Sequence, residues 1–254
     1  RVDTLGVSSA GIYINNRTMV ASLFLKVPQD QFDTKVKDIY LRVAKELGDV
    51  PIEVRNDGDV TALAGATSLK DTCILGIAMG TSEAVGYVNK DGSLTGWLNE
   101  LAFMPVDYNP KAMVDEWSGD YGCGVKYFSQ DAVIKLAPAA GIQLDEGLTP
   151  AEKLSVAQNL LEEGDSGAEK IFASIGYYLG YAIAHYSDFY DIKHLLILGR
   201  VTSGRGGKIM LEKAREVLET EFPELSQICL HLPDESDRRV GQAIAAAGLT
   251  PLSE

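Results

Sequence analysis

The amino-acid sequence predicts an α/β fold, with a largely parallel sheet and helices packed on it. Short runs rich in β-branched residues alternate with longer segments whose apolar residues recur at helical spacing, and this alternation is typical of α/β proteins. The 254 residues, 46% hydrophobic and 23% charged, suffice for one large globular domain or two modest ones.

The composition also narrows the range of functions. The net charge of −13 argues against a nucleic-acid-binding surface in this portion of the protein. No apolar run approaches the ~20 residues of a membrane span, so no membrane partner is expected. Cys73, Cys123 and Cys229 are too few and too far apart for a disulfide framework, which favours a cytoplasmic protein.

Strands are predicted at the β-branched runs, which are bounded by polar or turn residues. One stretch departs from the strand–helix alternation, because residues 83–98 are typical of a hairpin with its turn at Asn89–Gly92. The predicted strands lie in residues 4–14, 51–54, 72–79, 83–88, 194–199 and 227–232.

Helices are predicted where apolar residues form a stripe and capping residues flank it. In the first helix, Asp33 is the predicted N-cap and Gly48 the stop signal. Ser129 is the predicted N-cap of the second helix, and Thr149 and Glu152 form a capping-box pattern at the third. Helix 166–190 is apolar on most faces and is expected to be buried. Its Gly176 and Gly180, four positions apart on one face, are expected to let another element pack closely. The predicted helices lie in residues 33–47, 129–137, 149–164, 166–190, 206–222 and 237–249.

Polar residues follow the predicted strand 51–54 directly, where a ligand of an open α/β sheet is expected. Asn56 can donate to and accept from hydroxyl groups, and Asp57 can accept a hydroxyl proton during phosphoryl transfer. The alternative is structural, since Asp57 or Asp59 can cap a helix that starts near Val60. Taken alone, the motif favours the cap.

Two further turns after strands could bind phosphate or nucleotide. Gly80 allows close approach of the backbone to a ligand, and Thr81 offers a hydroxyl and N–H groups. Gly199 opens a second glycine-containing turn before a helix, where a nucleotide could lie. Each turn alone is more typical of a plain connection. The three histidines have no metal-ligand spacing with one another or with a cysteine, and structural roles are expected for them.

Together and in this order, the segments resemble the ROK family of repressors, open-reading-frame proteins and sugar kinases, in the actin- and hexokinase-like superfamily. "GVSSAG" from Gly6 is similar to the family's early strand and glycine loop, and "VRNDGDVTALAGA" to its "NDANAAAL" element. "LGIAMGTSEAVGYV" is similar to the second phosphate motif "LGTGxGGG", and "GWLNELAFMPV" to "GExGHxxV". The stretch from Ile175 to Val201 resembles the helix and strand before the adenosine-binding turn, so the resemblance covers nearly the whole chain.

The resemblance implies a ribonuclease-H-like, actin-like ATPase fold with a mixed sheet and flanking helices. Residues 1–80 would be the remainder of an N-terminal lobe and residues 81–254 the C-terminal lobe, with the last helix free to pack back on the first lobe. The family opens with a "DxGGTxxR"-like phosphate loop, and only "RVDTL" precedes the region matching Gly6. The first lobe is therefore expected to be incomplete in this chain.

The resemblance also implies roles for individual residues. Asp57 matches the catalytic base, and Asn56 and Glu100 match sugar ligands. Gly80 and Thr81 would contact phosphate. Gly199 would line the adenosine pocket. The implied cofactors are ATP and Mg²⁺, and the implied substrate is a sugar. Members of the family are often dimeric, so the resemblance also implies a homodimer.

The sequence departs from the family at its zinc motif, C-G-C-G-x-x-G-C-x-E with a histidine upstream. Only Cys123 remains among the thiols, since Glu116 and Ser118 replace the other two cysteines and Phe103 the histidine. One thiolate does not make a structural zinc site, so no zinc is expected there. Val125 stands at the motif's final glutamate, and with Phe103 it removes two of four expected sugar contacts.

The second phosphate loop departs as well, because Ser82, Ala84 and Val85 replace glycines and Glu83 introduces an acid. An acid ~5 Å from a phosphate oxygen costs roughly 3 kcal/mol at an effective dielectric of 20. Either Glu83 points away from the nucleotide, or Mg²⁺ offsets it, or the loop does not hold ATP. The alternation of side chains along the strand permits the first option.

The leading prediction is a sugar-kinase-like protein that transfers the γ-phosphoryl group of ATP to a sugar hydroxyl, with Asp57 as the base. The alternative is a non-catalytic, sugar-sensing regulator of the repressor type on the same fold. A third hypothesis is a divergent scaffold protein whose cleft no longer binds any ligand.

Overall fold

A four-stranded mixed sheet forms the centre of the protein, with strand order β6-β5-β7-β8. The computed structural model describes residues 2–233, 241 and 243–249. In this sheet β6 is antiparallel to β5, whereas β7 is parallel to β5 and β8 is parallel to β7. The strands are β5 (Ile74–Met79), β6 (Glu83–Val88), β7 (His194–Leu198) and β8 (Cys229–His231).

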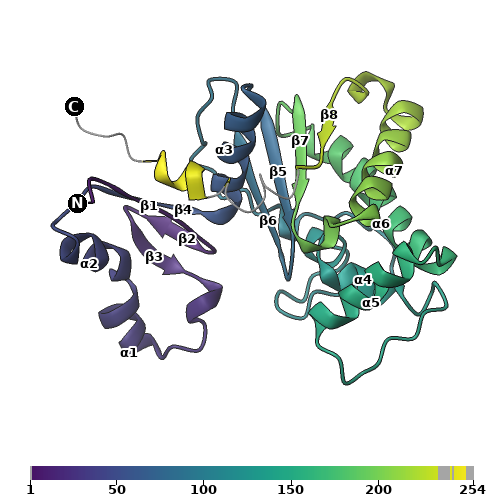
Figure 1. Ribbon diagram of the computed structural model, residues 1–254, viewed down its shortest axis with the longest axis horizontal. Helices are drawn as coiled ribbons and strands as arrows, with labels where there is room; N and C mark the ends of the chain where they lie inside the picture. The colour runs from purple at the N-terminus through teal and green to yellow at the C-terminus, as the bar shows by residue number, and fades with distance from the viewer. Residues whose placement is uncertain (1, 234–240, 242, 250–254) are drawn as a thin grey trace.

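A smaller part of the chain lies to one side of this sheet (Figure 1). Here β1 pairs in parallel with β4, in a register that places Ser9 opposite Asn56. The antiparallel hairpin of β2 and β3 and the helices α1 and α2 complete it. The elements are β1 (Leu5–Ser9), β2 (Ile12–Ile14), β3 (Arg17–Val20), α1 (Gln29–Gln31), α2 (Ile39–Glu46) and β4 (Ile52–Asn56).

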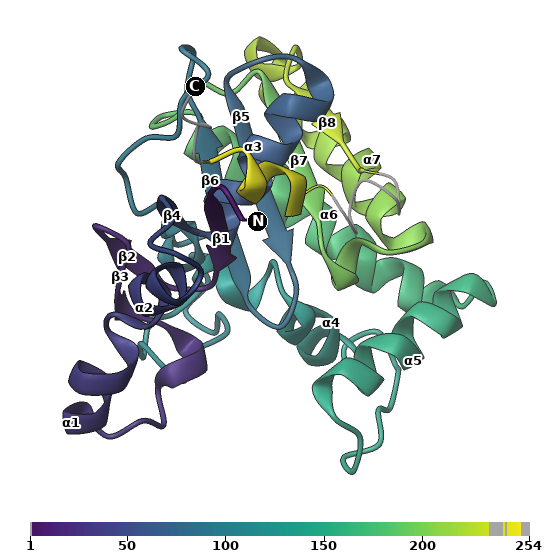
Figure 2. The same ribbon diagram turned by 60° about the vertical axis from the view of Figure 1, so that its left-hand side comes forward.

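Helices cover both faces of the central sheet, as Figures 1 and 2 show. On one face, α3 (Asp57–Leu69) packs on β5 and β6, with Ala62, Ile74 and Val88 in a small cluster. On the other face lies the main core, to which α6 and α7 contribute. The helices of this side are α4 (Gln130–Leu136), α5 (Pro150–Glu162), α6 (Ser166–Tyr186) and α7 (Arg205–Glu221).

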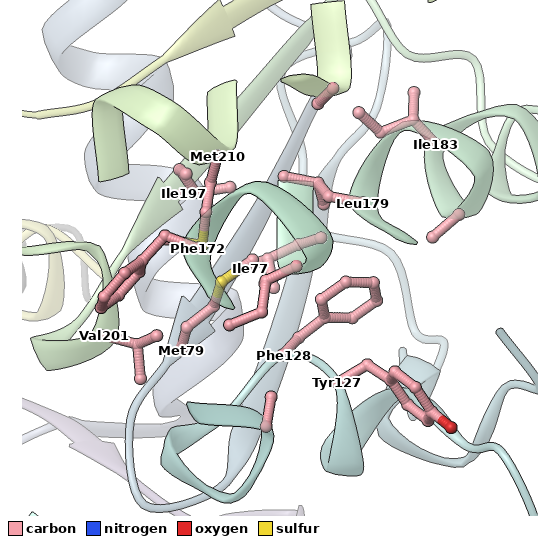
Figure 3. Packing of buried hydrophobic residues seen from close by; sticks show 14 of the residues in the cluster. Ile77, Met79, Tyr127, Phe128, Phe172, Leu179, Ile183, Ile197, Val201 and Met210 are labelled. Atoms are coloured by element: carbon pink, nitrogen blue, oxygen red, sulfur yellow. The ribbon is translucent and has the colours of Figure 1, made fainter. Parts of the chain in front are cut away.

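The main core fills the space between the sheet and the long helix α6. Figure 3 shows Ile77 and Met79 of β5 packed among Phe128, Phe172 and Leu179, all fully buried. Burial of an aliphatic or aromatic side chain of this kind stabilises the fold by roughly 1.5–3 kcal/mol. The core therefore holds β5 and β7 rigidly, and the loops at their carboxyl ends start from fixed positions.

Close packing of α6 on α7 depends on two glycines, as their spacing predicts. A methyl group on Gly176 would lie 2.6 Å from the carbonyl oxygen of Met210, and one on Gly180 would lie 2.6 Å from Cβ of Val217. Both distances are below any real contact of this kind, so only glycine lets the helices come this close.

The caps predicted for two helices are confirmed. Ser129 Oγ accepts a hydrogen bond from the backbone N–H of Asp131 at the start of α4. At the start of α5, Thr149 and Glu152 form the reciprocal capping box, with Pro150 in the first turn. The prediction for Asp33 is wrong. Asp33 lies inside the wider helical turn Phe32–Val36, and α2 follows with Asp38 as its N-cap.

The predicted strand 4–14 is two strands, because the chain turns at Gly11, whose φ is +139°. Strand β3 lies outside the predicted strands. It is only four residues long, and it is recognised by its pairing with β2 rather than by a sequence pattern. The predicted hairpin over 83–98 is reduced to one bridge, Val88 to Leu94, around the turn at Asn89–Gly92. The long partner of β6 is β5.

The strand pairing bears on the division into two lobes. A boundary after residue 80 separates β5 from β6, although six consecutive residue pairs join these strands. The pairing favours a boundary before β5, and the division stays a prediction.

The last helix is described at residues 241 and 243–247. Its Ala245 and Ala246 pack with Val60 of α3, and a methyl group on Gly6 of β1 would overlap Ala246. None of the helices in the described part of the chain is long and apolar enough to cross a membrane.

A buried ammonium group holds the irregular segment between β6 and α4. The Lys126 side chain is 7% exposed, and its Nζ lies 2.7 Å from Asp131, 2.5 Å from Glu116 and 3.4 Å from Asp115. Burial alone disfavours this charge, but the hydrogen bonds to Asp131 and Glu116 outweigh burial and raise the pKa of Lys126. Asp115 is itself buried, so the pair is costly to break.

We expect Lys126→Met to lower the free energy of unfolding by about 3 kcal/mol, because it leaves the buried Asp115 carboxylate unpaired. Lys135→Met is the matched control, since the Lys135 ammonium lies 3.4 Å from Glu116 at the surface and its loss should cost under ~1 kcal/mol. Urea unfolding followed by circular dichroism measures both. Equal losses in the two variants would show that the cluster does not stabilise this segment.

The carboxyl group of Glu83, at the start of β6, is buried on the same face of the sheet as α6. Glu83 is 6% exposed, and neither of its oxygens has a hydrogen-bond partner among the described residues. A methyl group on Gly124 would lie 2.6 Å from Glu83 Oε2, so this glycine makes room for the acid. Burial, and secondly the charge of Glu100, raise the pKa of Glu83 to about 8.

This shift makes stability depend on pH. The raised pKa favours the protonated acid in the folded state, so its contribution is complete below pH ~4.5 and is lost as the pH rises towards 8. The loss is ~5 kcal/mol at most for a shift of this size. We expect Glu83→Gln, which stays neutral, to match the parent at pH 4.5 and to exceed it in stability at pH 9. Denaturant titrations across this range test it, with the exposed Glu219→Gln as control. Parallel pH profiles for parent and Glu83→Gln would contradict the assignment.

Candidate functional site

The first part of the candidate site is the junction of β4 and α3, which follow one another without a loop. Asn56 is the last residue of β4 and the N-cap of α3. Its Oδ1 accepts from the N–H of Gly58 at 2.8 Å, and its Nδ2 donates to the carbonyl of Gly11 at 2.9 Å. The predicted capping role for Asp57 or Asp59 is therefore wrong, since Asn56 supplies the cap. One amide hydrogen and one lone pair of Asn56 remain for a ligand.

Asp57 is the first residue of α3 and is half-buried. Its Oδ1 accepts a hydrogen bond from the N–H of Gly58 at 3.1 Å. Burial nevertheless outweighs the hydrogen bonds and raises the pKa of Asp57. The pKa of Tyr13, on β2, is raised by burial and to a lesser extent by the nearby charge of Asp57. A carboxylate with a raised pKa is a stronger proton acceptor once ionised.

Asp59 has a different role, because it anchors the segment that carries Glu100. Asp59 Oδ1 accepts from Nδ2 of Asn99 at 3.1 Å, and Asn99 Oδ1 accepts from the hydroxyl of Tyr190 at 3.2 Å. Asn99 is buried and has a φ of +52°, which asparagine tolerates better than most residues. Burial raises the pKa of Asp59 to about 6.

Glu100 follows Asn99 and is accessible to solvent. Partial burial, and secondly the charge of Asp57, raise its pKa. The charge of Asp57 therefore acts on Glu100, although the two residues are 43 positions apart in the sequence. Two neighbouring acids can hold the hydroxyl groups of a ligand, because ionised carboxylates accept hydrogen bonds.

The second part of the site lies where β5 and β7 end side by side. A methyl group on Gly199 would lie 2.3 Å from the carbonyl oxygen of Met79, and Gly199 has a φ of +108°. Only glycine fits this position. The turn after β5 is closed by a hydrogen bond from Gly80 N–H to the carbonyl of Ser82 at 3.0 Å, and Gly80 accepts from Gln130 N–H at 2.9 Å. Thr81 is exposed at its tip.

A cavity of about 220 Å³ opens beside Gly199, beyond the carboxyl end of β7. Ligands of open α/β sheets bind at this end of the strands. The cavity has a mixed wall, with a lysine, two hydroxyl groups and apolar side chains. Its lining consists of Leu198, Thr202, Ser203, Gly204, Lys208, Leu232 and Pro233.

The structure thus brings the predicted residues into two groups. Asn56, Asp57 and Glu100 form one, and Gly80, Thr81 and Gly199 belong to the other. The start of α3 packs on β6, where a methyl group on Gly86 would lie 2.1 Å from the carbonyl oxygen of Gly58, so the first group adjoins the sheet that carries the second.

Sequence reasoning missed Tyr13 and Asn99. Tyr13 lies in a run of ordinary strand residues, and nothing in its spacing marks it. The position of Asn99 next to Glu100 was the available signal.

The position of the family's zinc motif has a different structure here. Cys123 is buried, Phe103 packs against the ring of Trp117 at 5.5 Å, and Glu116 binds the Lys126 ammonium. A cation placed here would face the charge of Lys126. The absence of zinc from this position stays a prediction.

Two histidines that appear unrelated in the sequence lie side by side. His194 starts β7 and His231 ends β8, and His194 Nδ1 is 2.9 Å from His231 Nε2. Their separation along the chain gives no metal-ligand pattern, because each comes from a different strand. The structural roles expected for the histidines stay a prediction.

Comparison with known proteins identifies the fold. No protein-family model matches the sequence, and no curated protein does so either. The structure is similar to a ROK hexokinase from Thermus thermophilus, with a TM-score of 0.71 and 18% identity over 97% of this chain and 78% of that one. It is similar to a ROK-family glucokinase from Streptomyces griseus in complex with glucose and AMPPNP (TM-score 0.70, 18% identity, 98% and 82% covered).

A ROK-family transcriptional regulator, a homologue of the E. coli MLC protein, is similar to the same degree, with a TM-score of 0.70 and 18% identity over 98% of this chain and 63% of that one. The resemblance of fold to the actin-like sugar kinases, expected from the sequence, is therefore confirmed. Kinases and a regulator share this architecture, and this chain has the fold that both use.

Proposed function

We propose that this chain is a divergent ROK-family protein that binds a sugar and a nucleotide and transfers the γ-phosphoryl group of ATP to a sugar hydroxyl. The observation that carries the proposal is the pairing of Asp57 with Glu100 beside the end of β4. The charge of Asp57 acts on Glu100, and the first turn of α3 packs on β6, the strand that follows the turn at Gly80.

Asp57 would accept the proton of the attacking hydroxyl group. Its place at the end of β4 is rigid, because the Asn56 cap and the Gly58 contact hold the first turn of α3. General-base assistance of this kind contributes roughly 10²- to 10⁴-fold to a rate. Glu100 and the remaining hydrogen-bonding capacity of Asn56 would orient the sugar.

ATP would lie between the turn at Thr81 and the cavity beside Gly199. The exposed tip of the first turn presents Thr81 to the phosphates, and Lys208 lines the cavity. Glu83 does not oppose a phosphate here, because its carboxyl group is buried in the core and its raised pKa favours the neutral form. Mg²⁺, when bound with ATP, would offset the phosphate charge and the acids around it.

The comparisons support the same reading at the level of fold. Glucose and AMPPNP are bound in one neighbour and sucrose in another. A cytoplasmic location fits the three free cysteines of this chain. A homodimer is proposed from the family resemblance alone.

A regulatory role without catalysis is the second candidate, and the similarity to the MLC homologue favours it. The regulatory role is also favoured by Phe103, Val125 and Ala84, which stand where the ROK family has residues that contact sugar or phosphate. Such a protein would bind sugar through Asp57 and Glu100 without phosphorylating it.

The kinase proposal predicts that Asp57→Asn abolishes most turnover. We expect roughly 10²- to 10⁴-fold lower kcat with little change in sugar affinity, because only the proton transfer is lost. ADP release by the full-length protein, with ATP, Mg²⁺ and a panel of sugars, measures kcat. Calorimetry measures sugar binding.

Asp59→Asn is the matched control, because it is the same change two positions along α3, and an asparagine Oδ1 can still accept the hydrogen bond from Asn99. Turnover that Asp57→Asn leaves unchanged would contradict the proposed base. Sugar binding without turnover in the parent protein would favour the regulator.

A further inference from the structure

A cluster of metal-ligating side chains lies far from the proposed site, on the α3 side of β7 and β8. His194, Cys229 and His231 each offer one donor atom, and the three donors lie within 4.8 Å of one another. His194 pairs with Cys229 across the two strands, and Cys229 and His231 are two positions apart on β8. Because side chains of a strand alternate, all three project from the same face of the sheet.

The spacing of these donors fits a transition-metal ion. A tetrahedral zinc site with bonds of about 2.0–2.3 Å places neighbouring donors roughly 3.3–3.6 Å apart. His194 Nδ1 and His231 Nε2 are 2.9 Å apart and need to separate by only a few tenths of an ångström. The Cys229 side chain is exposed and can rotate its sulfur towards them.

A carboxylate already orients one of these ligands. His194 Nε2 lies 3.0 Å from Asp71 Oδ2, in the connection between α3 and β5. When Nε2 donates its proton to this carboxylate, Nδ1 carries the free lone pair and faces His231. Metal-bound histidines commonly have this second hydrogen bond, which fixes the ring and its tautomer. Lys193 forms an ion pair with Asp71 and offsets its charge.

We propose that His194, Cys229 and His231 bind one Zn²⁺ ion, with Asp71 orienting His194. The fourth position is open to solvent, since Cys229 is exposed and His231 only partly buried. One thiolate and two neutral imidazoles suit zinc, whereas hard ions such as Mg²⁺ prefer oxygen ligands. The ion would join the edge strand β8, which pairs with β7 over three residues, to the rest of the sheet.

Metal titrations of the full-length protein, first freed of metal with a chelator, test this assignment. We expect one Zn²⁺ per chain and a rise in melting temperature with excess Zn²⁺. Co²⁺ in place of Zn²⁺ should give a tetrahedral spectrum with a thiolate-to-cobalt charge-transfer band. Cys229→Ser should remove that band, and His194→Ala and His231→Ala should each weaken binding by more than about tenfold.

Matched variants separate a metal site from a hydrogen-bonded network. Asp71→Asn should weaken Zn²⁺ binding by about 10- to 100-fold, as expected for a carboxylate that orients a ligand. His185→Gln, which leaves the three donors and Asp71 in place, should bind as the parent does. Circular dichroism shows whether each variant is folded. Cys229→Ser is expected to disturb the fold least, because Cys229 is exposed. A Co²⁺ spectrum without the thiolate band, or a Zn²⁺ affinity that Cys229→Ser and His194→Ala leave unchanged, would overturn the site.

Discussion

The contact between the start of α3 and the middle of β6 is the constraint on which the candidate site depends. Gly58 and Gly86 let two backbones meet, since a methyl group on either would lie 2.5 Å or less from the backbone of the other element. This contact sets the depth of Asp57 relative to the central sheet. It also joins the β1–β4 part of the chain to the main core, because α3 continues directly from β4.

Around this contact, three segments distant in sequence meet in one place. The β4–α3 junction brings Asp57, the segment after β6 brings Glu100, and β2 brings Tyr13. Asn99 connects the first two by its hydrogen bond to Asp59, and its own position depends on Tyr190, which follows α6. A change deep in the core near α6 would therefore reach the site through Tyr190 and Asn99.

Buried charge is handled in two different ways in the same region. Glu83 lies without a hydrogen-bond partner among the described residues and is kept neutral by its surroundings, whereas Lys126 remains charged because carboxylates surround it. Both groups border the irregular segment between β6 and α4. The Lys126 ammonium group joins the carboxylates of this segment, and the rings of Phe103 and Trp117 add an apolar contact. The segment thus has an internal source of stability in these contacts.

Sequence by itself determined the alternation of strands and helices, the caps at Ser129 and Thr149, and the close packing at Gly176 and Gly180, since these follow from local propensity and spacing. It also singled out Asp57, through an ordered set of motifs. Only the tertiary structure decided that Asn56 is the cap, that Glu83 points into the core, and that the charge of Asp57 acts on Glu100. It alone joined His194 to His231 and Cys229. The physical reason is that capping pairs and helical stripes depend on neighbours a few residues apart, whereas burial, pKa and ligand sets depend on strands that meet from distant parts of the chain.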